Sequence, residues 1–183
     1  MVLSKSEKTK LVILEAAAQV LSKQADATLN DIAEAASVGR ATLHRHFSSR
    51  EDLIKSLALK AIDDVQDIAR PAIEDAASSK EALANLVEVL VPLGHKYRFL
   101  ATDPISYSDP EVSAKYNQHL TRLSDLAMGL KAENEIADDI PIAWVVAVID
   151  ALIYAAWFTL EDGYIAKRDA APLAIRSILG GLR

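Results

Sequence analysis

Residues 28 to 50 read TLNDIAEAASVGRATLHRHFSSR, and the character of this stretch changes at residue 39. The first half predicts a short helix that begins after Thr28, because a threonine followed three residues later by an acid has the capping-box spacing. Apolar residues then recur at the i, i+3, i+4, i+7 spacing that places them on one helix face: Leu29, Ile32, Ala33 and Ala36. The stretch therefore opens with an amphipathic helix that buries one side.

The second half, from Arg40 to Phe47, follows a turn at residues 36–39 and has few apolar positions. Polar and basic side chains occupy most of it: Arg40, Thr42, His44, Arg45 and His46. A buried helix cannot hold that many polar groups, so we expect most of its surface to face a polar partner. An amphipathic helix, a tight turn and a basic helix form the arrangement that lays a recognition helix in the major groove of DNA.

This segment resembles the N-terminal domain of the TetR family of bacterial transcriptional regulators, whose run is approximately T..IA..AGVS..TLY.HF..K..L. The likeness covers about residues 8 to 55, and beyond it only helical character and overall length agree. The matching residues are Thr28, Ile32, Ala33, Ala36, Val38, Thr42, Leu43, His46, Phe47, Arg50 and Leu53.

Three positions depart from the family run. Ser37 replaces a turn glycine at a position that often needs positive φ, at a cost of roughly 1 kcal/mol. Gly39 replaces the serine that caps the recognition helix and contacts phosphate, so one phosphate contact is lost, although glycine is an acceptable cap. His44 replaces a tyrosine, and an imidazole can still hydrogen-bond a phosphate.

The resemblance implies contacts to double-stranded DNA from Thr28, Gly39, Arg40, Ala41, Thr42, His44, Arg45, His46 and Arg50. Arg40 lies near the helix N-terminus and is the best candidate for bidentate reading of guanine. Arg50 resembles the lysine that grips phosphate at the start of the next helix. Lys5, Lys8 and Lys10 form either a basic arm on the DNA backbone or a frayed, solvated terminus.

Composition predicts an all-α fold, because 51% of the 183 residues are hydrophobic and glycine and proline number only six each. The chain has no cysteine, which excludes disulfides and thiolate metal sites. Residues 1–60 hold nine Lys/Arg and seven Asp/Glu, whereas the remainder holds eleven and nineteen. The acidic total of −6 is therefore compatible with DNA binding, since the positive charge lies where the motif is.

We expect an N-terminal three-helix DNA-binding domain over residues 1–48, a linker helix over 49–70, and a helical ligand-binding and dimerisation domain over 71–183. The linker helix should end near Pro71, and Pro92 should break the next helix. Further helices are predicted over about 6–22, 80–100, 110–133, 141–163 and 172–179, with Pro141 at the first position of its helix.

The most apolar run, Ile142 to Leu160, is interpreted as a fully buried helix at a core or subunit interface. A membrane span is disfavoured because Pro141 opens the run, Asp150 interrupts it and no basic flank anchors its start. Met1 leads into a polar, Lys-rich segment instead of an apolar signal region, so we expect a cytoplasmic protein.

Asp150 forms an i, i+4, i+7 stripe with Tyr154 and Trp157 on this apolar helix. A carboxylate there needs a partner or water, and a ligand could supply either. With Tyr116, His119, Tyr97 and Phe99, these residues are candidates for an effector site, since such sites are apolar with a few convergent polar groups. The alternative, an ordinary core in which Asp150 finds a donor or faces a subunit interface, stays open.

No metal, cofactor or catalytic site is expected. Histidines 44 and 46 point to different sides of a helix, and the chain has no nucleophile elbow, glycine-rich phosphate loop or HExxH sequence. The resemblance implies a homodimeric regulator, usually a repressor, released from a palindromic operator by a small apolar or aromatic effector. Its dimer interface would come from residues 141–163 and 172–179. Activation in place of repression, and a ligand-binding protein that has lost DNA binding, are the remaining alternatives.

Overall fold

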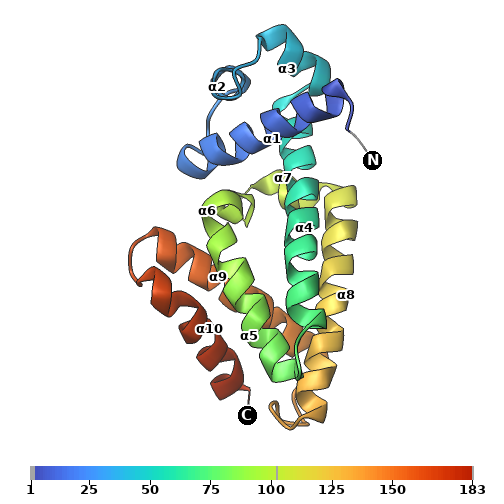
Figure 1. Ribbon diagram of the computed structural model, residues 1–183, viewed down its shortest axis with the longest axis vertical. Helices are drawn as coiled ribbons and strands as arrows, with labels where there is room; N and C mark the ends of the chain where they lie inside the picture. Colours follow the sequence, from blue (N-terminus) through green and yellow to red (C-terminus); the bar gives the residue numbers. More distant parts are fainter. Residues whose placement is uncertain (1–2, 102, 183) are drawn as a thin grey trace.

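The computed structural model describes residues 3–101 and 103–182, and every regular element among them is helical. Figure 1 shows a small upper part, formed by the first three helices, above a longer helical body. The elements are α1 Lys5–Lys23, α2 Leu29–Ala35, α3 Arg40–His46, α4 Arg50–Glu74, α5 Ser79–Leu90, η1 Val91–Leu93, α6 Gly94–Tyr97, η2 Arg98–Ala101, α7 Pro104–Ser108, α8 Pro110–Ala132, α9 Ile142–Glu161 and α10 Lys167–Gly181. The predicted all-α fold is confirmed.

Side-chain caps start the helices where the sequence predicts them. The Thr28 side chain accepts a hydrogen bond from the Asp31 N–H, and the Asp31 carboxylate accepts one from the Thr28 N–H at 2.7 Å. Ser49 caps α4 by accepting from the N–H of Asp52 at 3.1 Å. Each cap satisfies an N–H that an α-helix leaves without an intrahelical partner.

The turn between α2 and α3 places Ser37 at φ 54°, so a serine occupies the left-handed conformation that favours glycine. The N–H of Ser37 donates to Glu34 at 2.9 Å and that of Val38 to Ala33 at 3.0 Å, and these bonds hold the turn closed. The positive φ expected at this position is confirmed.

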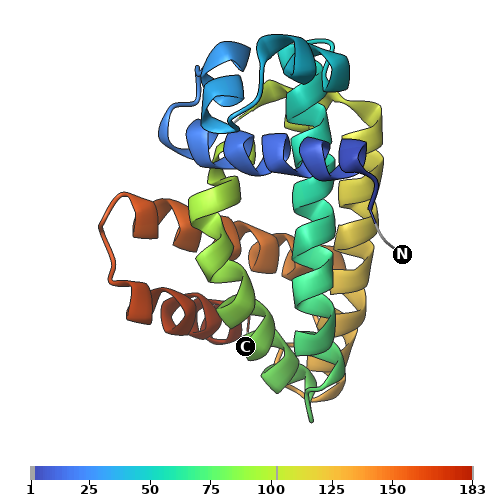
Figure 2. The same ribbon diagram turned by 45° about the horizontal axis from the view of Figure 1, so that its top comes forward.

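Two apolar cores lie along α4. The upper core joins α1, α2 and α3 to the first turns of α4 and extends to Tyr97 and Leu100 below them. The lower core joins the second half of α4 to α5, α8, α9 and α10. In Figure 2, α1 runs across α4 and α6, so the upper helices rest directly on the long body.

Two prolines lie inside helices that were predicted to stop or begin at them. Helix α4 does not end near residue 70 but continues through Pro71 to Glu74. Helix α10 begins at Lys167 instead of 172 and includes Pro172. A proline removes one N–H donor from a helix, and packing of the flanking turns against the lower core offsets this cost. The break expected at Pro92 is confirmed, since α5 gives way there to the 3₁₀ turn η1.

Helix α9 is less buried than its composition predicts. Pro141 stands just before the helix as its N-cap, not at its first position. This helix is long and apolar enough to cross a membrane, a test that core helices of other proteins also pass. Only a third of its most apolar 18-residue stretch is buried within the chain. Trp144 is 60% exposed, and Ala143, Ala147, Ala151 and Ala155 are exposed as well. Burial within the core of the chain itself is therefore only partial, and burial at a subunit interface, the other expectation for this helix, stays a prediction.

Close packing at Gly94 generates a stability prediction. A Cβ at this position would lie 2.5 Å from the ring of Trp157, whose Nε1–H donates to the Leu90 carbonyl at 2.9 Å. We expect Gly94→Ala to lower the free energy of unfolding by about 1–3 kcal/mol, because the indole must shift. Thermal denaturation by circular dichroism measures the effect.

Gly39→Ser is the matched control, since nothing lies within 4 Å of a Cβ there and serine is a good N-cap. It should leave the melting temperature unchanged or slightly raised. An unchanged melting temperature for Gly94→Ala would contradict the close contact with Trp157.

Candidate functional site

Helix α3 is held by its apolar side and presents its polar side to solvent. Leu43 and Phe47 are buried in the upper core, at 1% and 0% exposure. The predicted contact residues Arg40, Ala41, His44 and Arg45 are exposed, as is the capping Gly39, and Thr42 is half-buried. In Figure 1, α3 lies at the top of the molecule, away from α9 and α10. The arrangement presents a short basic helix on an open end of the chain.

His46 and Thr28 differ from the other predicted contact residues. His46 is half-buried, its Nε2 is buried without a hydrogen-bond partner among the described residues, and its ring centroid lies 6.4 Å from that of Phe47. The Thr28 hydroxyl is engaged with the Asp31 carboxylate at 2.7 Å. The Thr28 side chain thus contacts the first turn of α2, and the His46 ring lies beside Phe47 at the end of α3. A DNA contact from either side chain stays a prediction.

Arg50 turns its guanidinium toward protein groups. Its Nη2 donates to the Ala25 carbonyl at 2.6 Å and its Nε to the Ala27 carbonyl at 3.5 Å, both in the loop before α2. Its Nη1 also lies 3.9 Å from Asp103, which caps α7. Arg50 therefore fastens the loop that leads into α2 to the start of α4. Its predicted phosphate contact is untested, and spacing alone could not reveal these partners.

A cavity of about 510 Å³ lies between α4, α6, α8 and α9, below the upper core. We call it the aromatic cavity. It is lined by Ala58, Ala61, Ile62, Val65, Leu90, Tyr97, Leu100, Ala101, Ser106, Val112, Tyr116, His119, Asp150, Ile153, Tyr154, Trp157 and Phe158. Its volume lies in the range of small-molecule sites.

Six of the seven predicted ligand residues line this cavity: Tyr97, Tyr116, His119, Asp150, Tyr154 and Trp157. Phe99 does not, because it packs in the upper core. The wall formed by α4 was not predicted, because its small apolar residues resemble an ordinary core stripe. Ser106 was not predicted either; its Oγ is buried without a hydrogen-bond partner among the described residues.

Asp150 is hydrogen-bonded to a tyrosine at the cavity wall. The Tyr116 hydroxyl donates to Oδ2 of Asp150 at 2.5 Å, and Tyr154 lines the same cavity. Burial raises the pKa of Asp150, although the Tyr116 hydrogen bond opposes this shift. Burial also raises the pKa of Tyr116, with the neighbouring Tyr154 and Asp150 adding to it. The tyrosine hydroxyl therefore stays protonated and acts as the donor.

His119 stands between the aromatic cavity and a second one. It is 9% exposed and stacks on Tyr116 with ring centroids 6.1 Å apart. Burial lowers its pKa and the nearby Arg122 lowers it further, so its imidazole is neutral at pH 7. This side chain contributes polarity to both cavities without a formal charge.

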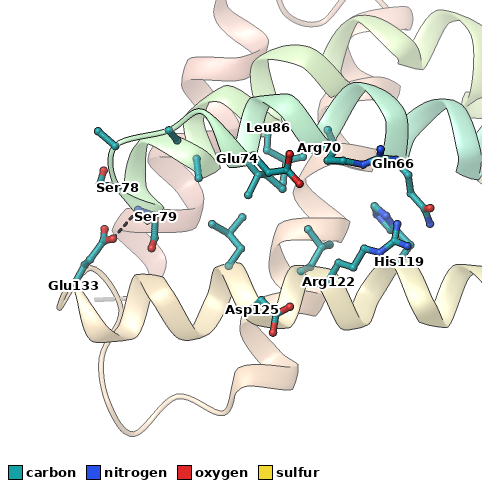
Figure 3. A pocket seen from close by; sticks show the side chains of 17 residues that line it. Gln66, Arg70, Glu74, Ser78, Ser79, Leu86, His119, Arg122, Asp125 and Glu133 are labelled. Atoms are coloured by element: carbon teal, nitrogen blue, oxygen red, sulfur yellow. Dashed lines mark hydrogen bonds between the residues drawn. The ribbon is translucent and has the colours of Figure 1, made fainter.

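The second cavity, of about 730 Å³, lies between the end of α4, the start of α5 and α8 (Figure 3). Its floor is apolar, and charges of both signs stand on its rim, including Arg70, Glu74, Arg122 and Asp125. Glu133 closes one end by accepting hydrogen bonds from the N–H groups of Ser79 at 2.6 Å and Lys80 at 3.2 Å.

Polar bridges connect the aromatic cavity to the upper helices. The Tyr97 hydroxyl donates to Asp64 of α4, and Lys96 beside it lies 2.7 Å from Glu15 of α1. Lys96 also lies 3.8 Å from Asp64. Lys55 of α4 pairs with Glu111 at the start of α8, at 2.9 Å. Residues in or beside the cavity lining therefore form polar contacts with α1 and with α4.

No group of three or more His, Asp or Glu side chains among the described residues is placed to hold a metal ion.

Comparison with known proteins identifies the class. The sequence model of "Bacterial regulatory proteins, tetR family" matches residues 13–57. The HTH-type transcriptional repressor LfrR of Mycolicibacterium smegmatis is 33% identical over 170 residues, which cover 91% of this chain and 82% of LfrR. The crystal structure of LfrR from Mycobacterium smegmatis in complex with proflavine has a TM-score of 0.80 at 29% identity, covering 98% of this chain and 99% of that one.

A structure of the fatty acid degradation regulator FadR from Bacillus halodurans shares the fold, with a TM-score of 0.78 at 22% identity and coverage of 100% and 99%. A basic helix carried on a helix-turn-helix scaffold, above a helical body with a cavity, defines a DNA-binding transcriptional regulator. The chain belongs to the TetR family.

The contacts of Arg50 generate a prediction that separates support from phosphate binding. Arg50→Lys keeps the positive charge but loses the paired hydrogen bonds to the Ala25 and Ala27 carbonyls. We expect a loss of about 1–2 kcal/mol in the free energy of unfolding, measured by chemical denaturation. Arg45→Lys, on the exposed side of α3, is the control and should leave stability unchanged. An unchanged free energy of unfolding for Arg50→Lys would show that the positive charge, and not the two hydrogen bonds to the carbonyls, accounts for any contribution of Arg50 to stability.

Proposed function

We propose that the chain is a homodimeric repressor that binds a palindromic operator through α3 and leaves it when a small aromatic molecule occupies the aromatic cavity. The observation that carries the proposal is the exposed basic α3 joined by one continuous helix, α4, to the wall of that cavity. The relatives of the chain include the transcriptional repressor LfrR and the transcriptional regulator UidR, which supports a regulatory function.

The proposed DNA surface is the exposed side of α3. Arg40 near the N-terminus of the helix would read a base edge, while Thr42, His44 and Arg45 would contact phosphates or neighbouring bases. The backbone at Gly39 and the side chain of Ala41 are exposed and would allow close approach of the DNA. Thr28, His46 and Arg50 would act mainly by holding α2 and α3 in place. The excess of positive charge in residues 1–60 supports this surface.

A fluorescence-anisotropy titration tests the proposal. The protein is titrated into a duplex from upstream of its own coding sequence and into a scrambled duplex, at two salt concentrations. Tight binding to the upstream duplex, with two chains per duplex, is expected. Absence of binding to either duplex at low salt would favour a ligand-binding protein that has lost DNA binding.

Arg40→Ala should weaken binding to the preferred duplex by about 1–3 kcal/mol and relax the preference at one base pair, since a bidentate contact to guanine would be lost. Titration against single-base variants of the operator measures both effects. An equal loss of affinity for every duplex, scrambled DNA included, would contradict base reading by Arg40. In that case the side chain contacts only phosphate.

The exposed face of α9 supports the homodimer. Ala143, Ala147, Ala151 and Ala155 recur every four residues along it, and Trp144 extends the face. Small side chains let two helices approach closely, and an exposed apolar face of this length is typical of a subunit interface. Helix α10, which packs on α9, would complete a four-helix bundle with its mates. The proposed interface is therefore residues 142–161 and 167–181.

Ala147→Glu should convert the dimer to a monomer, because each carboxylate would be buried in the interface without a partner. Sedimentation velocity at micromolar concentration measures the change. Ala114→Glu is the matched control, since Ala114 is an exposed alanine on α8, outside the proposed interface. A dimeric Ala147→Glu variant would place the interface elsewhere.

The aromatic cavity supports an effector that is mainly apolar or aromatic, as its walls are. The relative LfrR has been crystallised with proflavine, a planar aromatic molecule. The ligand would release the protein from DNA if it binds more tightly to a conformation in which the two α3 helices of the dimer no longer match the spacing of the operator half-sites. Movement of α4 would carry this change, and the Lys96 bridge to Glu15 would pass it to α1. The proposed place of action is the cytoplasm, where the DNA lies.

A further inference from the structure

We infer that the ligand of the aromatic cavity is a lipophilic aromatic cation, and that the Asp150 carboxylate is the group that selects its charge. This inference rests on the proposed function, because it names the chemical class of the effector. It adds a sign of charge, which the apolar walls alone do not determine.

The charge of the cavity lining comes from one residue. Asp150 is the only acidic side chain among the described lining residues, and none of them is Lys or Arg. His119, the one imidazole, is neutral at pH 7 because burial lowers its pKa. When Asp150 is ionised, the field inside the cavity is therefore negative, and it attracts cations and repels anions.

Asp150 lacks a counter-charge in the structure. Its described hydrogen bond comes from the neutral hydroxyl of Tyr116, and no ion pair to it occurs among the described residues. The other half-buried acid near the cavity, Asp64, contrasts with it, since Lys60 lies 2.7 Å away and Lys96 3.8 Å. An unpaired, half-buried carboxylate is costly, and a bound cation would offset that cost.

Aromatic rings line the same cavity as this carboxylate. Tyr154 and Trp157 follow Asp150 on α9 and meet edge to face, with centroids 5.0 Å apart. Tyr116 stacks on His119 across the cavity on α8. Ring faces attract a delocalised cation and bury a planar molecule, so the rings and the carboxylate favour the same class of ligand. The buried Ser106 Oγ, without a described partner, offers a further hydrogen bond to an amino or ring N–H group.

Three tricyclic probes of nearly equal shape test the inference: 10-methylacridinium as the permanent cation, acridine at pH 8 as the neutral molecule, and acridine-9-carboxylate as the anion. Their dissociation constants are measured by fluorescence titration with the intact wild-type protein. We expect the cation to bind about 10-fold or more tightly than the neutral probe, and the anion to bind more weakly than either. Equal affinities, or tighter binding of the anion, would overturn the inference.

Asp150→Asn is the variant that isolates the charge. It keeps the size of the side chain and should abolish the preference for the cation, while affinity for acridine changes by less than about 3-fold. Ser106→Ala is the matched control, because it removes another polar group of the cavity lining but leaves the Asp150 carboxylate and its hydrogen bond from Tyr116; it should retain the preference for the cation. If Asp150→Asn fails to fold, the wild-type series with three charges still decides the outcome.

Operator binding is measured in parallel, so that the two proposals fail separately. Loss of operator binding on addition of 10-methylacridinium, in wild type but not in Asp150→Asn, is the result expected from both. Preference for the cation without any change in operator binding would support the charge selection and contradict release by this ligand. If the protein binds its operator but shows no preference among the three probes, the proposed DNA binding is supported and charge selection by Asp150 is wrong.

Discussion

Helix α4 runs without a break from the upper core to the lower core and packs against helices of both. Its first turns supply Leu53, Ile54 and Leu57 to the upper core, and its next turns supply Ala58, Ala61 and Val65 to the cavity wall. The helix has 25 residues and is about 37 Å long, so it reaches from the upper core past the cavity wall. In the proposed mechanism, a displacement of α4 at the cavity would be carried to the helices at its N-terminal end.

The net charge differs between the two ends of α4. Net positive charge is concentrated in the first sixty residues, where an anionic polymer would be bound. The body is acidic, and its one acid inside the aromatic cavity lacks a basic partner among the described residues. The bridges between the two parts are ion pairs of modest individual strength, such as Lys96 with Glu15. Contacts of that strength can be rearranged by a ligand without unfolding either part.

Predictions from sequence succeeded where the physics is local. The cap at Thr28, the strained turn at Ser37 and the amphipathic face of α2 depend on residues within a few positions of one another. The stripe of Asp150, Tyr154 and Trp157 was also predictable, because helical periodicity places these residues on one side. Errors arose at Pro71 and Pro172, where packing against the lower core overrides a local rule on proline.

The helical class and the helix-turn-helix could be predicted from the sequence, since both follow from short-range periodicity, capping and charge, whereas the set of DNA contacts was implied by the resemblance to the TetR family. Six residues of the cavity lining were also predicted as members of one effector site, with an ordinary core as the open alternative. Three features could not be predicted from the sequence: Arg50 binds the carbonyls of Ala25 and Ala27, Phe99 joins the upper core, and α4 forms a cavity wall. These features depend on contacts between segments up to about a hundred residues apart, and no local pattern encodes the distance between such segments.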